Sequence, residues 1–316
     1  MKLLFISSRY GGGLGGHASM LANQLIKSGH DVVKMNVPHI PIKNLRNPSF
    51  TILSTIKGLV STKNYDIVHA FNVPAAFAMR FAKGKKKVLS IHGVFSENIR
   101  TIHSEKLSFI GELAESKALK WADKLTTDSK ATQKEYKEKF GIDFEYLPSP
   151  IDIKKFEDVP KKPKVENQVV YLGRDSYEKG IDVLKSAESE INGKVVYCTD
   201  LSWIEAMSTL LASSVLVLPS RMESLPTAVK EAFFLKVPVV ATNVGGVPEL
   251  VTNNENGILI PSNDPKKLAD AVNTILENKE LAQRFANNGY EFVINNMIWE
   301  VVLPKYIQFY ENLIKK

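Results

Sequence analysis

Two short apolar runs, separated by a polar loop and a helix, constrain the fold of this 316-residue chain most strongly. Residues 215–218 and 237–241 have the uninterrupted apolar character of strands that a parallel sheet buries on both faces. Between them, residues 227–236 show helical spacing directly after Pro226, and proline is favoured at a helix start. The segment therefore predicts a strand–helix–strand unit whose helix start offers free backbone N–H groups to a phosphate.

Two glutamates accompany this predicted helix. Glu223 stands in the loop before it, and Glu231 follows eight residues later within it, which gives the pattern E-x7-E. Ionised carboxylates accept hydrogen bonds from sugar hydroxyls, so the pair is a candidate for holding a sugar or a ribose. The pattern is weak by itself and depends on what the neighbouring strands carry.

The rest of the chain repeats the alternation of strand and helix, which is typical of doubly wound α/β domains with parallel sheets. A chain of this length favours two domains, and the proline- and lysine-rich residues 148–168 predict the connection between them. The remaining strands are expected at 2–7, 31–37, 65–70, 88–91, 124–127, 144–147, 169–172, 195–198 and 257–260. Helices are expected at 17–28, 50–61, 75–83, 97–122, 129–140, 181–190, 203–211, 264–278, 281–296 and 299–316, with a KGKKK turn after residue 82 and a kink or restart at Pro304.

Charge is distributed unevenly along the chain. Residues 1–150 contain 22 Lys and Arg against 12 Asp and Glu, whereas residues 151–316 contain 19 against 22. The basic half is expected to meet an anionic acceptor or an anionic membrane surface; a solvated lysine-rich surface is the alternative. No nucleic-acid-binding motif is present, so nucleic acid is not an expected partner.

Cysteine content and hydropathy bear on the compartment. Cys198 is the only cysteine, so no disulfide forms within the chain, and this suits a reducing cytoplasm. No apolar run approaches 18 residues, so no membrane span is expected. We therefore expect a cytoplasmic protein, with peripheral contact at the inner membrane face as a second expectation.

Other candidate site residues follow the ends of predicted strands, where open parallel sheets bind their ligands. The run GGGLGG at 11–16 follows the first strand and permits close backbone approach, although a flexible turn explains it equally well. His92, next to a glycine, follows the fourth strand. Arg174 and Lys179 follow the strand at 169–172, and a guanidinium and an ammonium together neutralise a diphosphate. Two solvated surface charges are the alternative.

Taken together, these motifs resemble the retaining GT-B glycosyltransferases of glycosyltransferase family 4 (group 1). The resemblance covers nearly the whole chain and includes DIVHAFN at 66–72, SIHG at 90–93, GRDSYEKG at 173–180, ESLPTAVKEA at 223–232 and PVVATNVGGVPE at 238–249. It implies two facing Rossmann-like domains, residues 1–150 with roughly 302–316 and residues 151–301, with the last helix crossing back to the N-terminal domain. Pro226, which lacks an N–H, and the sequence PSPID at 148–152 depart from the family pattern.

The resemblance also implies a role for each candidate residue. Arg174 and Lys179 would hold the diphosphate of a nucleotide sugar, Glu231 the ribose, and Glu223 and His92 the donor sugar. The remaining donor contacts would come from the backbone around Ser224, Leu225, Thr227 and Ala228 and from the glycine loop at Gly12 and Gly13.

The implied reaction is transfer of a hexose from a nucleoside diphosphate sugar to a glycan or lipid-linked acceptor, with retention of the anomeric configuration. The sequence contains no Asp-x-Asp pair, and cationic side chains with a helix start stabilise a leaving diphosphate, so no metal ion or other cofactor is expected. A sugar-nucleotide epimerase of the same fold and a non-catalytic nucleotide-sugar-binding module are the alternatives.

Overall fold

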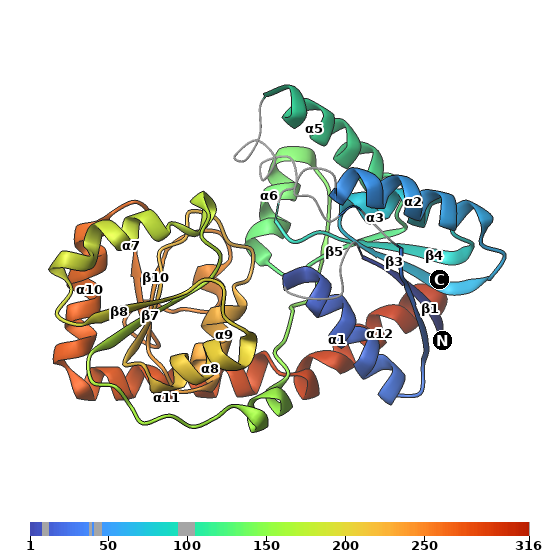
Figure 1. Cartoon of the computed structure of the whole chain (residues 1–316). Helices are drawn as coiled ribbons and strands as arrows, with labels where there is room; N and C mark the ends of the chain where they lie inside the picture. The colour runs from blue at the N-terminus through green and yellow to red at the C-terminus, as the bar shows by residue number, and fades with distance from the viewer. Residues whose placement is uncertain (8–12, 38–39, 41–45, 94–104, 316) are drawn as a thin grey trace. The chain divides into compact units, whose positions relative to one another are not determined.

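The computed structural model describes residues 1–7, 13–37, 40, 46–93 and 105–315, and the chain forms two compact units (Figure 1). Unit 1 comprises Met1–Ser149 together with Trp299–Lys316, and unit 2 comprises Pro150–Ile298. Each unit has its own parallel sheet and its own buried core, so the predicted doubly wound α/β class is confirmed. The last helix belongs to unit 1, as the predicted crossing requires.

Unit 1 is built on a six-stranded parallel sheet in the order β2-β1-β3-β4-β5-β6. The apolar residues of the central strands are buried, as those of strands covered on both faces must be. The chain reverses its direction of progress across the sheet between β1 and β3. The strands are β1 (Lys2–Ile6), β2 (Asp31–Met35), β3 (Tyr65–Phe71), β4 (Gly84–Ser90), β5 (Lys124–Thr127) and β6 (Glu145–Tyr146).

Helices cover both faces of this sheet. One face packs against α2 (Arg46–Val60), α3 (Val73–Phe81), α5 (Glu105–Leu119) and α6 (Lys130–Phe140), through a core that includes Phe50, Met79 and Tyr136. The other face packs against α1 (Gly13–Lys27) and α12 (Trp299–Lys315), through a core that includes Phe5 and Tyr310. Residues 299–315 therefore complete a layer that the first 149 residues leave partly open.

Unit 2 has a five-stranded parallel sheet in the order β11-β10-β9-β7-β8. Its strands are β7 (Gln168–Leu172), β8 (Lys194–Cys198), β9 (Val215–Leu218), β10 (Val239–Thr242) and β11 (Ile258–Ile260). From β7 the chain runs to one edge through β8, and from β9 to the other edge through β10. The point of reversal lies between β7 and β9, and open sheets of this kind bind ligands beyond the carboxyl ends of their strands at such a point.

The helices of unit 2 begin where the sequence provides caps. Ser202 and Glu205 form a capping box at α8 (Trp203–Ala212), and Asp264 caps α10 (Pro265–Glu277). The other helices are η1 (Ile153–Asp158), η2 (Tyr177–Lys179), α7 (Ile181–Ala187), η3 (Glu188–Glu190), α9 (Thr227–Phe234), η4 (Val247–Glu249) and α11 (Lys279–Asn296). No helix in the described ranges is both long and apolar enough to span a bilayer.

Several expected boundaries differ from the structure. The KGKKK turn was wrong, because β4 already begins at Gly84 and the lysines at 85–87 lie in this strand. A restart at Pro304 was also wrong, because α12 continues through it while Trp299, Val302 and Tyr306 hold the helix in the core. The first helix begins at Gly13 rather than at residue 17. Residues 97–104 of one expected helix lie outside the described residues, and α5 accounts for 105–119 of it.

Candidate active site

The candidate site in unit 2 is formed by the loops that follow β7 and β9, at the reversal point of the sheet. Arg174 and Lys179 stand after β7, and Glu223 stands after β9. β7 and β9 are hydrogen-bonded neighbours with the pair Tyr171–Val217 in register, so their carboxyl ends lie at the same edge of the sheet. The structure therefore gathers these predicted residues from two separate segments of the chain.

Two glycines allow the site loops to lie in direct backbone contact. A Cβ atom at Gly180 would lie 2.0 Å from the carbonyl oxygen of Pro219, and one at Gly245 would lie 1.8 Å from that of Glu223. Both glycines also have positive φ, +64° and +50°, which disfavours other residues. Glycine is therefore required at both positions if the loop carrying Glu223 is to keep its place.

An arginine that the sequence analysis did not single out ties the two loops together. The Arg221 guanidinium donates to both carboxylate oxygens of Asp182 at 2.7 and 2.6 Å, while its backbone N–H donates to the carbonyl of Glu178 at 2.9 Å. This side chain bond lowers the pKa of Asp182 below its ordinary value. The guanidinium also lies 4.1 Å from the ring centre of Tyr177. A planar, bidentate pair of this kind fixes orientation as well as distance.

Lys179 and Glu223 form an ion pair at the centre of the site. The Lys179 ammonium lies 2.7 Å from Oε1 of Glu223, and their side chains are 23% and 7% exposed. The Ser220 hydroxyl donates to the same carboxylate oxygen at 2.8 Å. Because an ammonium has three donors, this bond leaves Lys179 with further donors for a phosphate. Both contacts use Oε1 of Glu223, so its second carboxylate oxygen can accept hydrogen bonds from a ligand.

Arg174 is held more loosely than Lys179. Its side chain is 76% exposed and pairs with Glu178, four residues later, at 2.9 Å. Exposed pairs of this type contribute little to stability, so the guanidinium can exchange this partner for a stronger anion at small cost. The Arg174 carbonyl accepts a hydrogen bond from the Tyr171 hydroxyl at 2.7 Å. Burial, and then the nearby Glu223 charge, raise the pKa of Tyr171. Tyr171 therefore remains a donor at neutral pH.

Glu231 lies on α9 and is engaged by a tryptophan. The indole N–H of Trp203, the first residue of α8, donates to Oε1 of Glu231 at 2.7 Å. Burial raises the pKa of Glu231 above its ordinary value, and this hydrogen bond opposes the rise. Trp203 is itself packed edge-on against Phe156, with ring centres 5.0 Å apart. The carboxyl group thus lies in an apolar, aromatic surrounding, with one oxygen fixed.

The loop before α9 provides the predicted phosphate-facing backbone. Leu225 is buried, Ser224 and Ala228 are half-buried and Thr227 is exposed at the first position of the helix. Pro226 precedes the helix with φ −63° and contributes no N–H. The first N–H groups of an α-helix have no partner within it, so those of Thr227 and Ala228 carry the positive end of the helix dipole.

In unit 1, His92 follows β4 and contacts Asp128, which a residue beyond β6 also binds. Its Nδ1 atom lies 2.8 Å from Oδ2 of Asp128, which follows β5. Ser149, beyond β6, donates to the same oxygen at 2.9 Å. The ring of His17, on α1, lies 5.8 Å from that of His92. Asp128 was missed from the sequence, although it directly follows the strand predicted at 124–127.

The predicted glycine loop is only partly described. Gly12 lies outside the described residues, and Gly13 is the first residue of α1. Among the described residues there is no group of three or more His, Cys, Asp or Glu arranged to hold a metal ion.

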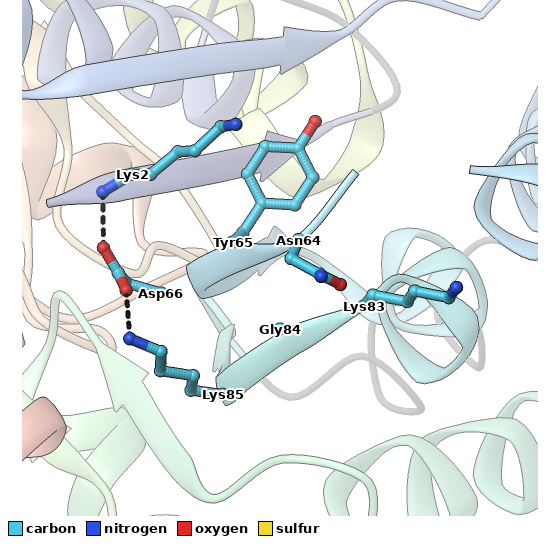
Figure 2. Close-up of a pocket in the computed structure, with 7 residues that line it drawn as sticks. All are labelled: Lys2, Asn64, Tyr65, Asp66, Lys83, Gly84 and Lys85. Carbon is cyan, nitrogen blue, oxygen red and sulfur yellow. Dashed lines mark hydrogen bonds and ion pairs between the residues drawn. The ribbon is translucent and has the colours of Figure 1, made fainter. Parts of the chain in front are cut away.

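A separate cavity of about 610 Å³ lies at the opposite edge of the unit 1 sheet, where β1, β3 and β4 begin. Figure 2 shows Asp66 between Lys2 and Lys85 in its wall. The backbone N–H of Lys2 and the ammonium of Lys85 each donate to Asp66 at 2.8 Å, and these bonds lower the pKa of Asp66. None of the predicted site residues lines this cavity.

Solved structures share this architecture over the whole chain. Sucrose-phosphate synthase from Thermosynechococcus elongatus aligns with a TM-score of 0.84 and 19% identity, covering 100% of this chain and 99% of that one. Anabaena HepE in complex with UDP-glucose aligns with a TM-score of 0.77 and 16% identity, covering 99% and 100%. Two Rossmann-like units with a returning last helix define the GT-B class of fold.

The family follows from the sequence comparisons. The family model "Glycosyl transferases group 1" matches residues 184–292, and "Glycosyltransferase Family 4" matches residues 11–155. An uncharacterized glycosyltransferase from Methanocaldococcus jannaschii is 26% identical over 322 aligned positions, which cover 90% of this chain and 86% of that protein. The chain belongs to the group 1, family 4 glycosyltransferases. This confirms the predicted family and enzyme class, which transfers a sugar from a nucleotide sugar to an acceptor.

Proposed function

We propose that this glycosyltransferase moves a hexose from a nucleoside diphosphate sugar to a glycan or lipid-linked acceptor, with retention of configuration and without a metal ion. The observation that carries the proposal is the ion pair of Lys179 and Glu223, beside Arg174 and the free start of α9. These groups support the proposal, because cations and helix N–H groups bind diphosphates and a carboxylate accepts hydrogen bonds from sugar hydroxyls.

The donor roles follow from the chemistry of each group. Arg174 and Lys179 take the negative charge that develops on the leaving diphosphate, together with the backbone of Ser224, Leu225, Thr227 and Ala228. Glu223 accepts hydrogen bonds from the hydroxyls of the donor sugar. Glu231 accepts them from the ribose, with the oxygen that Trp203 leaves available. In unit 1, His92 takes part in holding the donor sugar, and Gly12 and Gly13 in holding the phosphates and acceptor.

The proposed reaction needs no side-chain nucleophile. As the sugar–phosphate bond breaks, positive charge develops on the sugar and negative charge on the departing phosphate. The acceptor hydroxyl attacks from the face that the phosphate leaves, and the phosphate takes its proton. Stabilisation of the diphosphate by side chains and a helix start takes the place of a metal ion. The finding that the complex of HepE contains UDP-glucose supports trying UDP-sugars first.

The test is release of free nucleoside diphosphate from a panel of UDP-, GDP- and ADP-hexoses, with and without glycan or polyprenyl-phosphate-linked acceptors. We expect one donor to be consumed in an acceptor-dependent manner, and the same rate after treatment with a chelator. NMR of the product gives the anomeric configuration. Loss of activity on chelation would overturn the metal-free part, and an inverted anomer the retaining part. Binding of the donor without turnover over the whole panel would remove the transferase assignment.

A further inference from the structure

Helix α2 of unit 1 carries its large aliphatic side chains on the outside. It buries Phe50, Ser54 and Gly58, and Gly58 lies so close to α3 that a Cβ atom there would be 2.8 Å from the carbonyl oxygen of Ala78. Five aliphatic residues are exposed instead, by 39 to 72% of their surface. We call them the outer stripe: Ile52, Leu53, Ile56, Leu59 and Val60.

The outer stripe is one continuous surface of the helix. At 3.6 residues per turn, its five members fall within an arc of about 120°. Single exposed apolar residues are ordinary, but a contiguous group marks an interaction surface. A neighbouring helix of the same layer, α5, also packs against α3, and it exposes Phe109 by 61% and Leu113 by 47%, one helical turn apart. Two helices of this layer therefore expose large apolar side chains.

The charges on α2 and on the segments next to it in the sequence are of one sign. Residues 32–65 contain five basic residues and no acidic one. Among the basic residues, Lys57 lies on α2 and Lys63 just beyond its end, and both side chains are exposed. Unit 1 as a whole contains 25 Lys and Arg against 14 Asp and Glu, whereas unit 2 contains 16 against 20. The partner of this surface must therefore accept aliphatic side chains and offer negative charge.

We propose that the outer stripe inserts into the headgroup region of an anionic lipid bilayer, with Lys57 and Lys63 meeting the lipid phosphates. An interfacial helix with an apolar face and flanking cations binds such a surface by apolar burial and electrostatic attraction together. A second copy of this chain suits the surface less well, because it would bring the same cations into contact with one another. The inference rests on the proposed function in one respect: a lipid-linked acceptor would be met at this surface.

The experiment is flotation of the full-length chain with vesicles of phosphatidylcholine and phosphatidylglycerol (70:30), and with phosphatidylcholine alone. We expect binding to the anionic vesicles in 0.1 M salt, weaker binding in 0.5 M salt, and little binding to the neutral vesicles. The triple substitution Ile52→Ser, Ile56→Ser and Leu59→Ser should lower the partition coefficient at least tenfold. The double substitution Lys57→Glu and Lys63→Glu should remove the preference for anionic lipid.

The matched control replaces three equally exposed aliphatic residues of unit 2. Val165→Ser, Leu201→Ser and Ile204→Ser alter side chains that are 43, 48 and 45% exposed. This variant should bind vesicles within twofold of the wild-type protein. Because all the substituted side chains are exposed, the variants should fold, and thermal unfolding checks this. A single Leu59→Trp variant gives a second readout, since brominated acyl chains should quench its fluorescence, whereas Ile204→Trp should not respond.

Three results would overturn the inference: no binding of the wild-type protein to anionic vesicles at low salt, equal loss of binding in the control variant, or a concentration-dependent dimer that the triple substitution abolishes. Its failure is distinguishable from failure of the proposed function. Nucleoside diphosphate release with a water-soluble acceptor needs no vesicle, so an enzyme that turns over without binding lipid removes the docking surface alone. Binding through the stripe without turnover removes the transfer assignment alone.

Discussion

Nδ1 of His92 lies 2.8 Å from Oδ2 of Asp128, and the Ser149 hydroxyl holds that carboxylate from a third loop. A carboxylate on Nδ1 favours the tautomer with its proton there and leaves Nε2 as the acceptor when the ring is neutral. The orientation of the histidine at this sheet edge is therefore set by residues on the loops after β5 and β6.

We expect Asp128→Asn to lower kcat on the order of tenfold, equivalent to about 1.4 kcal/mol. His92→Ala should lower it further, on the order of 10²-fold, as loss of a preorganised polar contact does. The double variant should be no slower than His92→Ala, because Asp128 acts through His92. Asp143→Asn, an exposed carboxylate paired with Lys137, is the control. Steady-state kinetics decide this, and additive losses would contradict it.

The two cations of the donor site should differ in what their removal costs. Arg174→Ala should reduce kcat/KM on the order of 10²-fold while leaving the unfolding temperature nearly unchanged, because the Arg174–Glu178 pair is exposed. Lys179→Ala should reduce both, because it strands the nearly buried Glu223 carboxylate. Lys185→Ala, which removes an exposed partner of Asp175, should change neither. Full activity of Lys179→Ala would remove that residue from the site.

The close approach at Gly180 can be separated from its backbone conformation. Gly180 and Gly141 have nearly the same φ, +64° and +66°, but only Gly180 has a neighbour within 4 Å of an added Cβ. Gly141→Ala should cost about 1–2 kcal/mol of stability from the left-handed conformation alone. Gly180→Ala should cost more and should also lower the transfer rate, since the loop of Pro219 and Glu223 must shift. Equal losses in thermal unfolding would show that the clash relaxes freely.

Unit 1 should lose stability in mild acid through His69. Burial lowers the pKa of His69 well below its ordinary 6.5, and its two nitrogens lie 2.7 Å from the Tyr310 hydroxyl and 2.6 Å from the Ser90 hydroxyl. His69 binds a proton more readily in the unfolded chain than in the folded one. The stability that neutral His69 provides is therefore fully present above pH 6.5. It is lost as pH falls below 6.5, with a slope of up to about 1.4 kcal/mol per pH unit.

The measurement is denaturant unfolding between pH 8 and pH 5, in a Trp203→Phe background so that fluorescence reports Trp121 and Trp299 of unit 1. His69→Gln should be less stable than its parent at pH 8, and the difference should narrow below pH 6.5. A difference that stays constant down to pH 5 would contradict this, because it would mean that the pKa of His69 is the same in the folded and unfolded states.

The order of strands and helices could be predicted because most strands contain a short apolar run, and the strand predicted at 215–218 matches β9 residue for residue. The start of β4 could not. Its lysines resemble a turn, and they are accommodated only by tertiary contacts: Lys85 pairs with Asp66, and Lys87 donates to the carbonyl of Arg80. The sequence around residues 83–87 does not show that these partners, on β3 and α3, will lie beside the lysines.

Some residues of the candidate site could likewise be predicted from the sequence, and others could not. The rule that ligands bind beyond strand ends was enough to select Arg174, Lys179 and Glu223, and their roles stay predictions. Asp128, Arg221 and Trp203 were missed, because each gains its meaning from a residue on another segment. Knowing that β4 neighbours β5 would have drawn attention to Asp128 beside His92.

Helix α12 gives unit 1 a discontinuous chain, with 149 residues of unit 2 placed between its two parts. On the ribosome, the sheet of unit 1 emerges long before Tyr306 and Tyr310, so the apolar face around Phe5 and Phe71 has to wait for its cover. Unit 2, whose sequence is continuous, can finish folding first. Unit 1, although synthesised first, is therefore the last to be completed. A truncation before residue 299 damages unit 1 rather than unit 2, which directly precedes the truncated end.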